Sequence, residues 1–399
     1  MIFKKENSKL MIKLLKRKGE KMRGSQAKIE EKEITNSNNP KKQRDVSIDL
    51  LECIAIFLVV MCHSPIYSCY ILGDTSPIHY LRFFLKTLIA PCVALFFFAN
   101  GFLLFNKEFN LKKHLFKILN LVSLCIIWGI GKLIILMPIK NEFLTPREIL
   151  NGLWEWKLGW IESLWFLGTL VCIYLLFPLL KTTYDNKKNI FYYFTIMCTV
   201  LTIGNSLLNE IGSIILTTFF NRATPLEGFN FFNFFNLFRN LYGYAFAYFC
   251  IGGLFYNFKD KILSIKPLKR NIIAIVTMFL SCLCLWGIGI YYTKTSNQMW
   301  NLIWNGYDTV FTLINVICIY VLCLNLKKDY RLIHTISSNT LGIYLIHEII
   351  VNLTIKYVEQ YPFLCNFSFN IVYSGIILLI SLLIVLLMKK IPIIKRLVG

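Results

Sequence analysis

Two histidines and a glutamate lie inside segments of the chain that are otherwise almost entirely apolar. His63 stands near the end of segment 47–69, and His347 and Glu348 are adjacent in segment 332–354. Ionisable groups inside membrane-length apolar runs are costly and point to function. Histidine is the usual general base near neutral pH, and a nearby carboxylate can orient the ring and stabilise its charged form. These residues predict acid–base chemistry; the alternative is two histidines packed in a bundle with their hydrogen bonds satisfied.

The positions of the two histidines along their helices favour a shared site. At a rise of about 1.5 Å per residue, His63 stands about 24 Å beyond Ser47, and His347 stands about 22 Å beyond Leu332. If both helices run outward, the two rings reach a similar depth in the outer half of the bilayer. Glu52 precedes His63 by about three turns and lies on the same helix face, about 16 Å away along the axis. Such a stripe could line a passage from the cytoplasm to the outer leaflet.

The elements that must position these residues are predicted to be transmembrane helices. A span needs about 20 apolar residues to cross about 30 Å of hydrocarbon. The predicted spans, about ten in all, are 47–69, 82–105, 115–137, 162–181, 190–208, 236–257, 271–292, 302–325, 332–354 and 370–389. The stretch 211–220 is too short to cross, which predicts a re-entrant, interfacial or bent-helix segment. Three cations inside the spans are predicted toward the outer side: Lys86, Lys132 and Arg239.

Composition supports this all-α fold class, a polytopic transmembrane helix bundle. Hydrophobic residues make up 56% of the chain and charged residues only 16%, whereas soluble domains carry roughly 25% charged residues. The formal net charge of +21 does not indicate nucleic-acid binding, because the cations gather in the first 45 residues and in short loops between apolar runs. The 13 cysteines show no CxxC pair and no metal-ligand spacing, so no metal site is predicted.

The distribution of lysine and arginine also predicts the topology and the domains. Cytoplasmic loops of membrane proteins are enriched in these residues, and alternate loops of this chain carry most of them. The pattern predicts a multi-pass protein of the cell membrane with both termini in the cytoplasm. Residues 1–45 are predicted to be a disordered, basic cytoplasmic tail, and residues 46–399 the transmembrane domain.

Five segments, in order, resemble the membrane-bound acyltransferase-3 family, whose members transfer acyl groups to extracytoplasmic sugars and related acceptors. The resemblance runs from about Arg44 to the final span. Its segments are SIDLLECIAIFLVVMCHS (47–64), PCVALFFFANGFLL (91–104), ESLWFLGTLVCIYLLFPLL (162–180), YFCIGGLF (248–255) and ISSNTLGIYLIHEIIV (336–351). Each motif alone is short and apolar, but five in the same order are specific.

The resemblance implies a set of site residues. His63 matches the essential histidine of the family and would act as general base or carry the acyl group transiently, with His347 and Glu348 beside it. Near the acyl-CoA donor the resemblance places Glu52, Asn100 and Gly101, and the basic loop that follows adds Lys112 and Lys113, with Lys117 as a further candidate. On the acceptor side it places Trp165, Asn339 and Tyr344. Asn339 could instead cap or kink its helix, and Gly101, Gly252 and Gly253 could serve close helix packing.

One departure from the family pattern bears on the donor. The family has an arginine eleven residues before its histidine, thought to meet the acyl-CoA, where this chain has Glu52. A carboxylate repels the phosphates of CoA instead of pairing with them. An altered-donor or inactive member therefore stays an alternative.

The expected function is O-acyl transfer, with acetyl-CoA as donor and co-substrate. The acceptor is expected to be a hydroxyl of a cell-surface polysaccharide or of its lipid-linked precursor. The expected partners are thus the bilayer, acyl-CoA and an extracytoplasmic carbohydrate, with no nucleic acid. Two rivals remain: a polysaccharide or small-molecule exporter, since polar stripes also mark permeation paths, and a non-catalytic, donor-impaired membrane protein.

Overall fold

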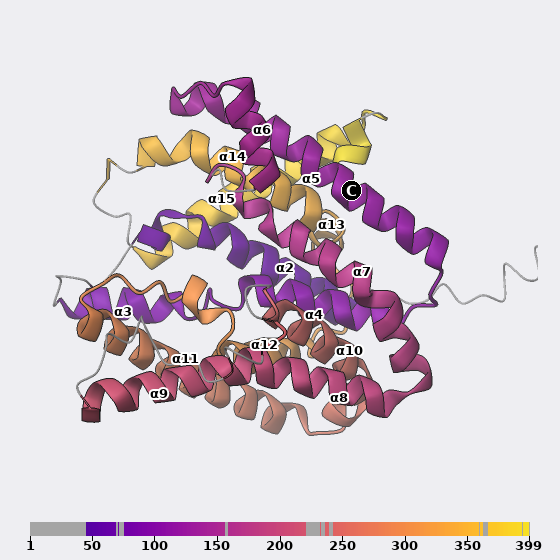
Figure 1. The fold of residues 1–399 in the computed structure, drawn as a ribbon, viewed down its shortest axis with the longest axis vertical. Coiled ribbons are helices and arrows are strands. Elements are labelled where there is room, and N and C mark those ends of the chain that lie inside the picture. Colours follow the sequence, from indigo (N-terminus) through magenta and orange to yellow (C-terminus); the bar gives the residue numbers. More distant parts are fainter. Residues whose placement is uncertain are drawn as a thin grey trace, which may run out of the picture. The chain divides into compact units, whose positions relative to one another are not determined.

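The computed structural model describes residues 45–68, 71, 76–155, 159–220, 232, 236–238, 242–358, 360–361, 366–392 and 394–398 (Figure 1). Within these ranges the chain forms helices and no strands. They are α2 (Val46–Cys62), α3 (Pro77–Lys86), α4 (Cys92–Phe105), α5 (Leu111–Lys140), α6 (Pro146–Glu155), α7 (Trp165–Asn186), α8 (Lys188–Thr199), α9 (Asn205–Phe220), α10 (Tyr244–Leu263), α11 (Pro267–Ser296), α12 (Val310–Cys323), α13 (Arg331–Ser337), α14 (Thr340–Val358) and α15 (Phe367–Met388). The predicted tail up to Arg44, and Arg239, lie outside the described residues.

Six of the described helical segments are long and apolar enough to cross a membrane. They are Leu111–Lys140, Glu162–Asn186, Lys188–Phe220, Pro267–Ser296, Thr340–Val358 and Phe367–Met388. The other four predicted spans contain α2, α3 with α4, α10 and α12, and their crossing of the membrane stays a prediction. α11 and α15 present rows of exposed apolar side chains, such as Ile272, Val276, Leu379 and Leu383. In a membrane protein such rows contact lipid, which agrees with the predicted fold class.

The predicted fifth span and the stretch after it form one long helical segment. α8 leads through a π-helical turn at Val200–Gly204 into α9, so residues 211–220 continue the helix (Figure 1). Of the alternatives for this stretch, continuation of the fifth helix is therefore the one the structure contains. A π turn inserts an extra residue into the helical ladder and is a known cause of a local bend.

The predicted second span is interrupted, contrary to the expectation of one helix over 82–105. α3 ends at Lys86 and α4 begins at Cys92. Pro91 lacks an N–H and disfavours helical geometry in the residue before it, which accounts for a break at this point. The Thr87 hydroxyl donates to the carbonyl of Phe84 at 2.7 Å and so satisfies the end of α3. Lys86 and Cys92, on the two sides of the break, are both buried.

The helix that carries His63 is the centre of the bundle. α2 contacts α4, α12, α13, α14 and α15, and its side chains are apolar around most of its circumference, as expected for a helix buried on all sides. Leu51, Ala55, Ile56 and Val60 have no exposed surface. The end of α2 is therefore held by packing from several helices.

Two glycines bring α4 and α10 into backbone contact. A Cβ added to Gly101 would overlap the carbonyl oxygen of Phe249, and one added to Gly252 would overlap the carbonyl oxygen of Phe98. Small residues allow such close approach between helices in membranes. Of the two roles considered for Gly101, the structure supports close packing.

Substituting alanine for Gly252 should destabilise the protein by about 2 kcal/mol or more, because the added methyl group forces the two helix backbones apart. The measurement is the thermal unfolding of the purified full chain in detergent. Gly168→Ala in α7 is the matched control, since nothing lies within 4 Å of a Cβ added there. Equal melting temperatures for the two variants would contradict the packing role.

Candidate active site

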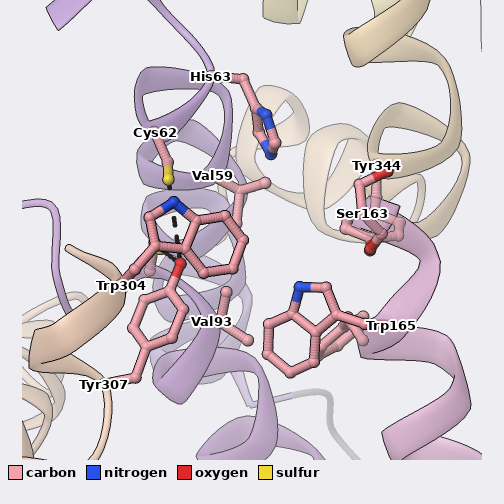
Figure 2. Close-up of a pocket in the computed structure, with 11 residues that line it drawn as sticks. Val59, Cys62, His63, Val93, Ser163, Trp165, Trp304, Tyr307 and Tyr344 are labelled. Atoms are coloured by element: carbon pink, nitrogen blue, oxygen red, sulfur yellow. Dashed lines mark hydrogen bonds between the residues drawn. The ribbon is translucent and has the colours of Figure 1, made fainter. Parts of the chain in front are cut away.

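His63 is the first residue after α2, at a point where the helix has to end. Its backbone N–H donates to the carbonyl of Val60 at 3.2 Å, and the hydroxyl of Ser64 donates to the carbonyl of Met61 at 2.7 Å. Pro65 follows, and a proline disfavours helical geometry in the residue before it. The ring of His63 thereby leaves the helix cylinder and points into a cavity (Figure 2).

The cavity beside His63 is small and mostly aromatic. Its volume is about 20 Å³, which is enough for about one water molecule. Its lining comes from α2, the start of α4, the Ile161–Phe166 region, the Trp304–Tyr307 region and α14. The lining residues are Val59, Cys62, His63, Cys92, Val93, Ser163, Trp165, Phe166, Trp304, Tyr307 and Tyr344. Two thiols and several polar groups thus face the same space as the histidine.

His347 lies directly against His63. The two ring centroids are 5.1 Å apart and the ring planes make an angle of 64°. His347 is fully buried, and its Nδ1 lies 2.7 Å from the carbonyl oxygen of Tyr344. Because a carbonyl only accepts, Nδ1 carries the proton and Nε2 keeps its lone pair. Within the described part of the chain, that buried Nε2 has no hydrogen-bond partner.

A buried ion pair stands behind the two histidines. The ammonium of Lys132, from α5, pairs with the carboxylate of Glu348, from α14, and also donates to the hydroxyl of Ser163 at 2.7 Å. Ser163 donates to Glu348 as well, and the hydroxyl of Tyr344 donates to the carbonyl of Ser163. This network joins α5, α14 and the turn before α7. The charges of Glu348 and Lys132 both act on the imidazoles of the two histidines, with opposite signs, and that of Glu348 acts more strongly.

Chemically, the site combines two neighbouring imidazoles, a buried ion pair and apolar walls. A neutral histidine can take a proton, and the carboxylate stabilises the resulting imidazolium. In the ranges that the structure describes, no group of three histidine, cysteine, aspartate or glutamate side chains could hold a metal ion.

A comparison with known families decides what kind of protein holds this site. The model of an acyltransferase domain matches residues 45–389, from the residue before α2 to the end of α15. The chain belongs to the acyltransferase-3 family. The family expected from the sequence is confirmed, and the helical fold with its apolar segments supports a multi-pass membrane acyltransferase. No curated protein and no solved structure matches the chain.

In this acyltransferase-3 protein, the residues predicted near the donor divide into two groups. Asn100 accepts a hydrogen bond from the hydroxyl of Tyr174 at 2.9 Å, and the charge of Glu52 acts on Tyr174 and Lys117. The ammonium of Lys117 lies 4.5 Å from the centroid of the Tyr174 ring. Lys112 and Lys113 lie in the first turn of α5 and are exposed. Of the three lysines considered, Lys117 is the one on which the charge of Glu52 acts.

The residues predicted near the acceptor are also divided. Trp165 and Tyr344 line the cavity. Asn339 stands at the junction of α13 and α14, about two turns before His347, and its side-chain NH₂ donates to the carbonyl of Thr335 at 2.6 Å. That bond goes to a carbonyl of α13, and the Oδ1 that would cap the start of α14 is buried without a hydrogen-bond partner in the described part of the chain. The structure therefore does not contain the capping contact, and Asn339 is not among the residues that line the cavity.

Sequence reasoning did not assign several residues that the acyltransferase-3 site contains. The sequence predicts Lys132 as a cation inside a span but does not name its partner. A single charge in an apolar run indicates that a buried partner of opposite charge is needed. Ser163, Cys62, Cys92, Trp304 and Tyr307 gave no such signal, because polar neutral residues and cysteines are common in helix interiors. Their place in the site follows only from the packing.

Proposed function

We propose that this chain transfers an acyl group, taken to be acetyl, from a cytoplasmic acyl-CoA to a hydroxyl of a cell-surface polysaccharide or its lipid-linked precursor. The observation that carries the proposal is the imidazole of His63, which faces a cavity while a second histidine and a buried carboxylate stand behind it. Family membership supports acyl transfer as the reaction class.

In the proposed reaction, His63 takes the proton of the acceptor hydroxyl as its oxygen attacks the acyl carbon. The Nε2 of His347 can accept a hydrogen bond from the neighbouring ring, and its Nδ1–H holds it in place through the carbonyl of Tyr344. Glu348 supplies the negative charge that stabilises protonated His63. The leaving thiolate of CoA then receives the proton.

The proposed topology places donor and acceptor on opposite sides of the bilayer. In a bundle of about ten spans with both termini cytoplasmic, α2 runs outward from Glu52 to His63. The cavity of about 20 Å³ is far smaller than a sugar, so acceptor binding requires the aromatic walls to open. Trp165, Trp304 and Tyr307 are suited to this, since aromatic rings can stack on sugar faces.

Deletion of the gene tests the proposal against export. If the chain is an acyltransferase, surface O-acyl groups disappear while the polymer reaches the surface in normal amount. Loss of the polymer itself would overturn the proposal in favour of an exporter.

The position of Glu52 yields a prediction about donor affinity. Under the proposed function, Glu52→Arg should lower the KM for acyl-CoA by about tenfold, because a hydrogen bond from a cation to an anion contributes about 1.5–3 kcal/mol. The measurement is the initial rate of acetyl transfer in membranes over a range of acetyl-CoA concentrations.

Glu52→Gln is the matched variant, since it removes the repulsion of the phosphates without adding a cation. Its KM should fall between those of the other two proteins. A KM that is the same in all three would show that the phosphates of the donor do not approach this residue.

A further inference from the structure

The cavity beside His63 holds a second reactive group that the proposed reaction does not use. Cys62 and Cys92 both line it, and the hydroxyl of Tyr307 lies 3.9 Å from the sulfur of Cys62 and 3.6 Å from that of Cys92 (Figure 2). Cys62 is the last residue of α2 and the direct neighbour of His63. A thiol and the predicted base therefore face one small space.

Cys92 and the buried side chain of Lys86 both interact with the thiol of Cys62. Lys86, at the end of α3, has no exposed surface, and its charge interacts with Cys62. A thiolate, and not a thiol, is the nucleophile in acyl exchange, and a nearby lysine favours the thiolate.

An unsatisfied donor in the wall of the cavity provides independent evidence. The indole nitrogen of Trp304 is buried and, in the described part of the chain, has no hydrogen-bond partner. An indole N–H can only donate, and a buried donor without a partner is costly. A carbonyl oxygen that becomes negative during acyl transfer would supply the missing acceptor.

From these contacts we infer that Cys62 carries the acyl group as a thioester between donor and acceptor. The inference rests on the proposed function. The Cys62 thiolate attacks the carbonyl carbon of acyl-CoA, the new S–C bond forms, and the bond to CoA breaks. The released CoA thiolate takes the proton that Cys62 lost. In the second step the acceptor oxygen attacks the same carbon, His63 takes its proton, and Cys62 leaves as a thiolate.

A covalent intermediate lets the donor and the acceptor use the cavity in turn. A thioester on Cys62 retains the activation of the original thioester, so the donor can leave before the acceptor arrives. Trp304 would donate to the oxyanion in both steps.

The test follows radiolabel from acetyl-CoA onto the protein in membranes that hold the full chain. His63→Ala should accumulate label, because the second step lacks its base, and neutral hydroxylamine should release the label as expected for a thioester. Peptide mass spectrometry should find the acetyl group on Cys62. Cys62→Ala should take up no label, whereas Cys318→Ala, which changes a buried thiol outside the cavity lining, should behave like the wild type.

Trp304→Phe keeps an aromatic ring and removes the N–H, so labelling should slow by about 100-fold. Label on Cys92 or on His63 itself would overturn the assignment to Cys62. Full acetyl transfer to the acceptor by Cys62→Ala would overturn it while leaving the proposed function intact. A wild-type protein that transfers nothing to any acceptor would instead reject the proposed function.

Discussion

Replacing His63 with alanine should reduce acyl transfer to the acceptor by about 10²–10⁴-fold, the usual contribution of a positioned general base. The ring faces the cavity and stands beside His347, so its removal takes away the group best placed to receive the acceptor proton. The measurement is transfer of labelled acetyl from acetyl-CoA to the acceptor fraction in membranes.

The fold of the His63→Ala variant should be kept, because the ring lies at a cavity and not in the packed core. Its melting temperature in detergent should therefore stay close to that of the wild type. His334→Ala is the matched control, since His334 lies exposed on α13, and its ring nitrogen Nδ1 lies 2.9 Å from the hydroxyl of Ser338. Transfer that survives in His63→Ala at the wild-type rate would reject the mechanism.

The sequence alone predicted that the two histidines lie at a similar depth on their helices. A helical rise is nearly constant, so the distance of each residue from the start of its apolar segment predicted a common depth. The structure brings the rings into contact. Composition predicted the all-helical class for a different reason. In a lipid-embedded segment of this length, a helix is the structure that satisfies every backbone hydrogen-bonding group within the segment itself. The family assignment followed from motif order, which is also independent of tertiary packing.

The hydrogen-bond and ion-pair partners of these residues could not be predicted from the sequence. Glu348 was expected to serve a histidine, but its hydrogen bonds go to Lys132 and Ser163. Which residue of α5 faces α14 depends on the rotation of each helix about its axis, and the apolar residues of α5 surround it on all sides. The break before Cys92 was missed because the stretch from Leu88 to Ala99 is apolar apart from Pro91. Pro91 was its only local signal.

The buried pair of Lys132 and Glu348 leads to the second large expected effect. Lys132→Met should destabilise the protein by about 3–5 kcal/mol, because it leaves the carboxylate of Glu348 buried without its cation. Lys132 is 1% exposed, so water cannot replace the lost partner. The measurement is thermal unfolding of the purified protein in detergent. Asp185→Asn is the comparison variant: its carboxylate, about half-exposed, pairs with Lys181 at 2.6 Å, and Lys181 keeps its hydrogen bond to the carbonyl of Phe105, so the cost should be clearly smaller.

The double variant Lys132→Met/Glu348→Gln separates support of the fold from support of the chemistry. Removing both charges leaves neither of them unpaired, so most of the lost stability should return. Acyl transfer should stay low, because the carboxylate that stabilises protonated His63 is absent. A double variant that regains both stability and transfer would show that the pair serves folding alone. One that regains neither would show that the hydrogen bonds of Ser163 and Tyr344 depend on these two charges, and that Glu348 holds the cavity wall in place as well as acting on the histidines.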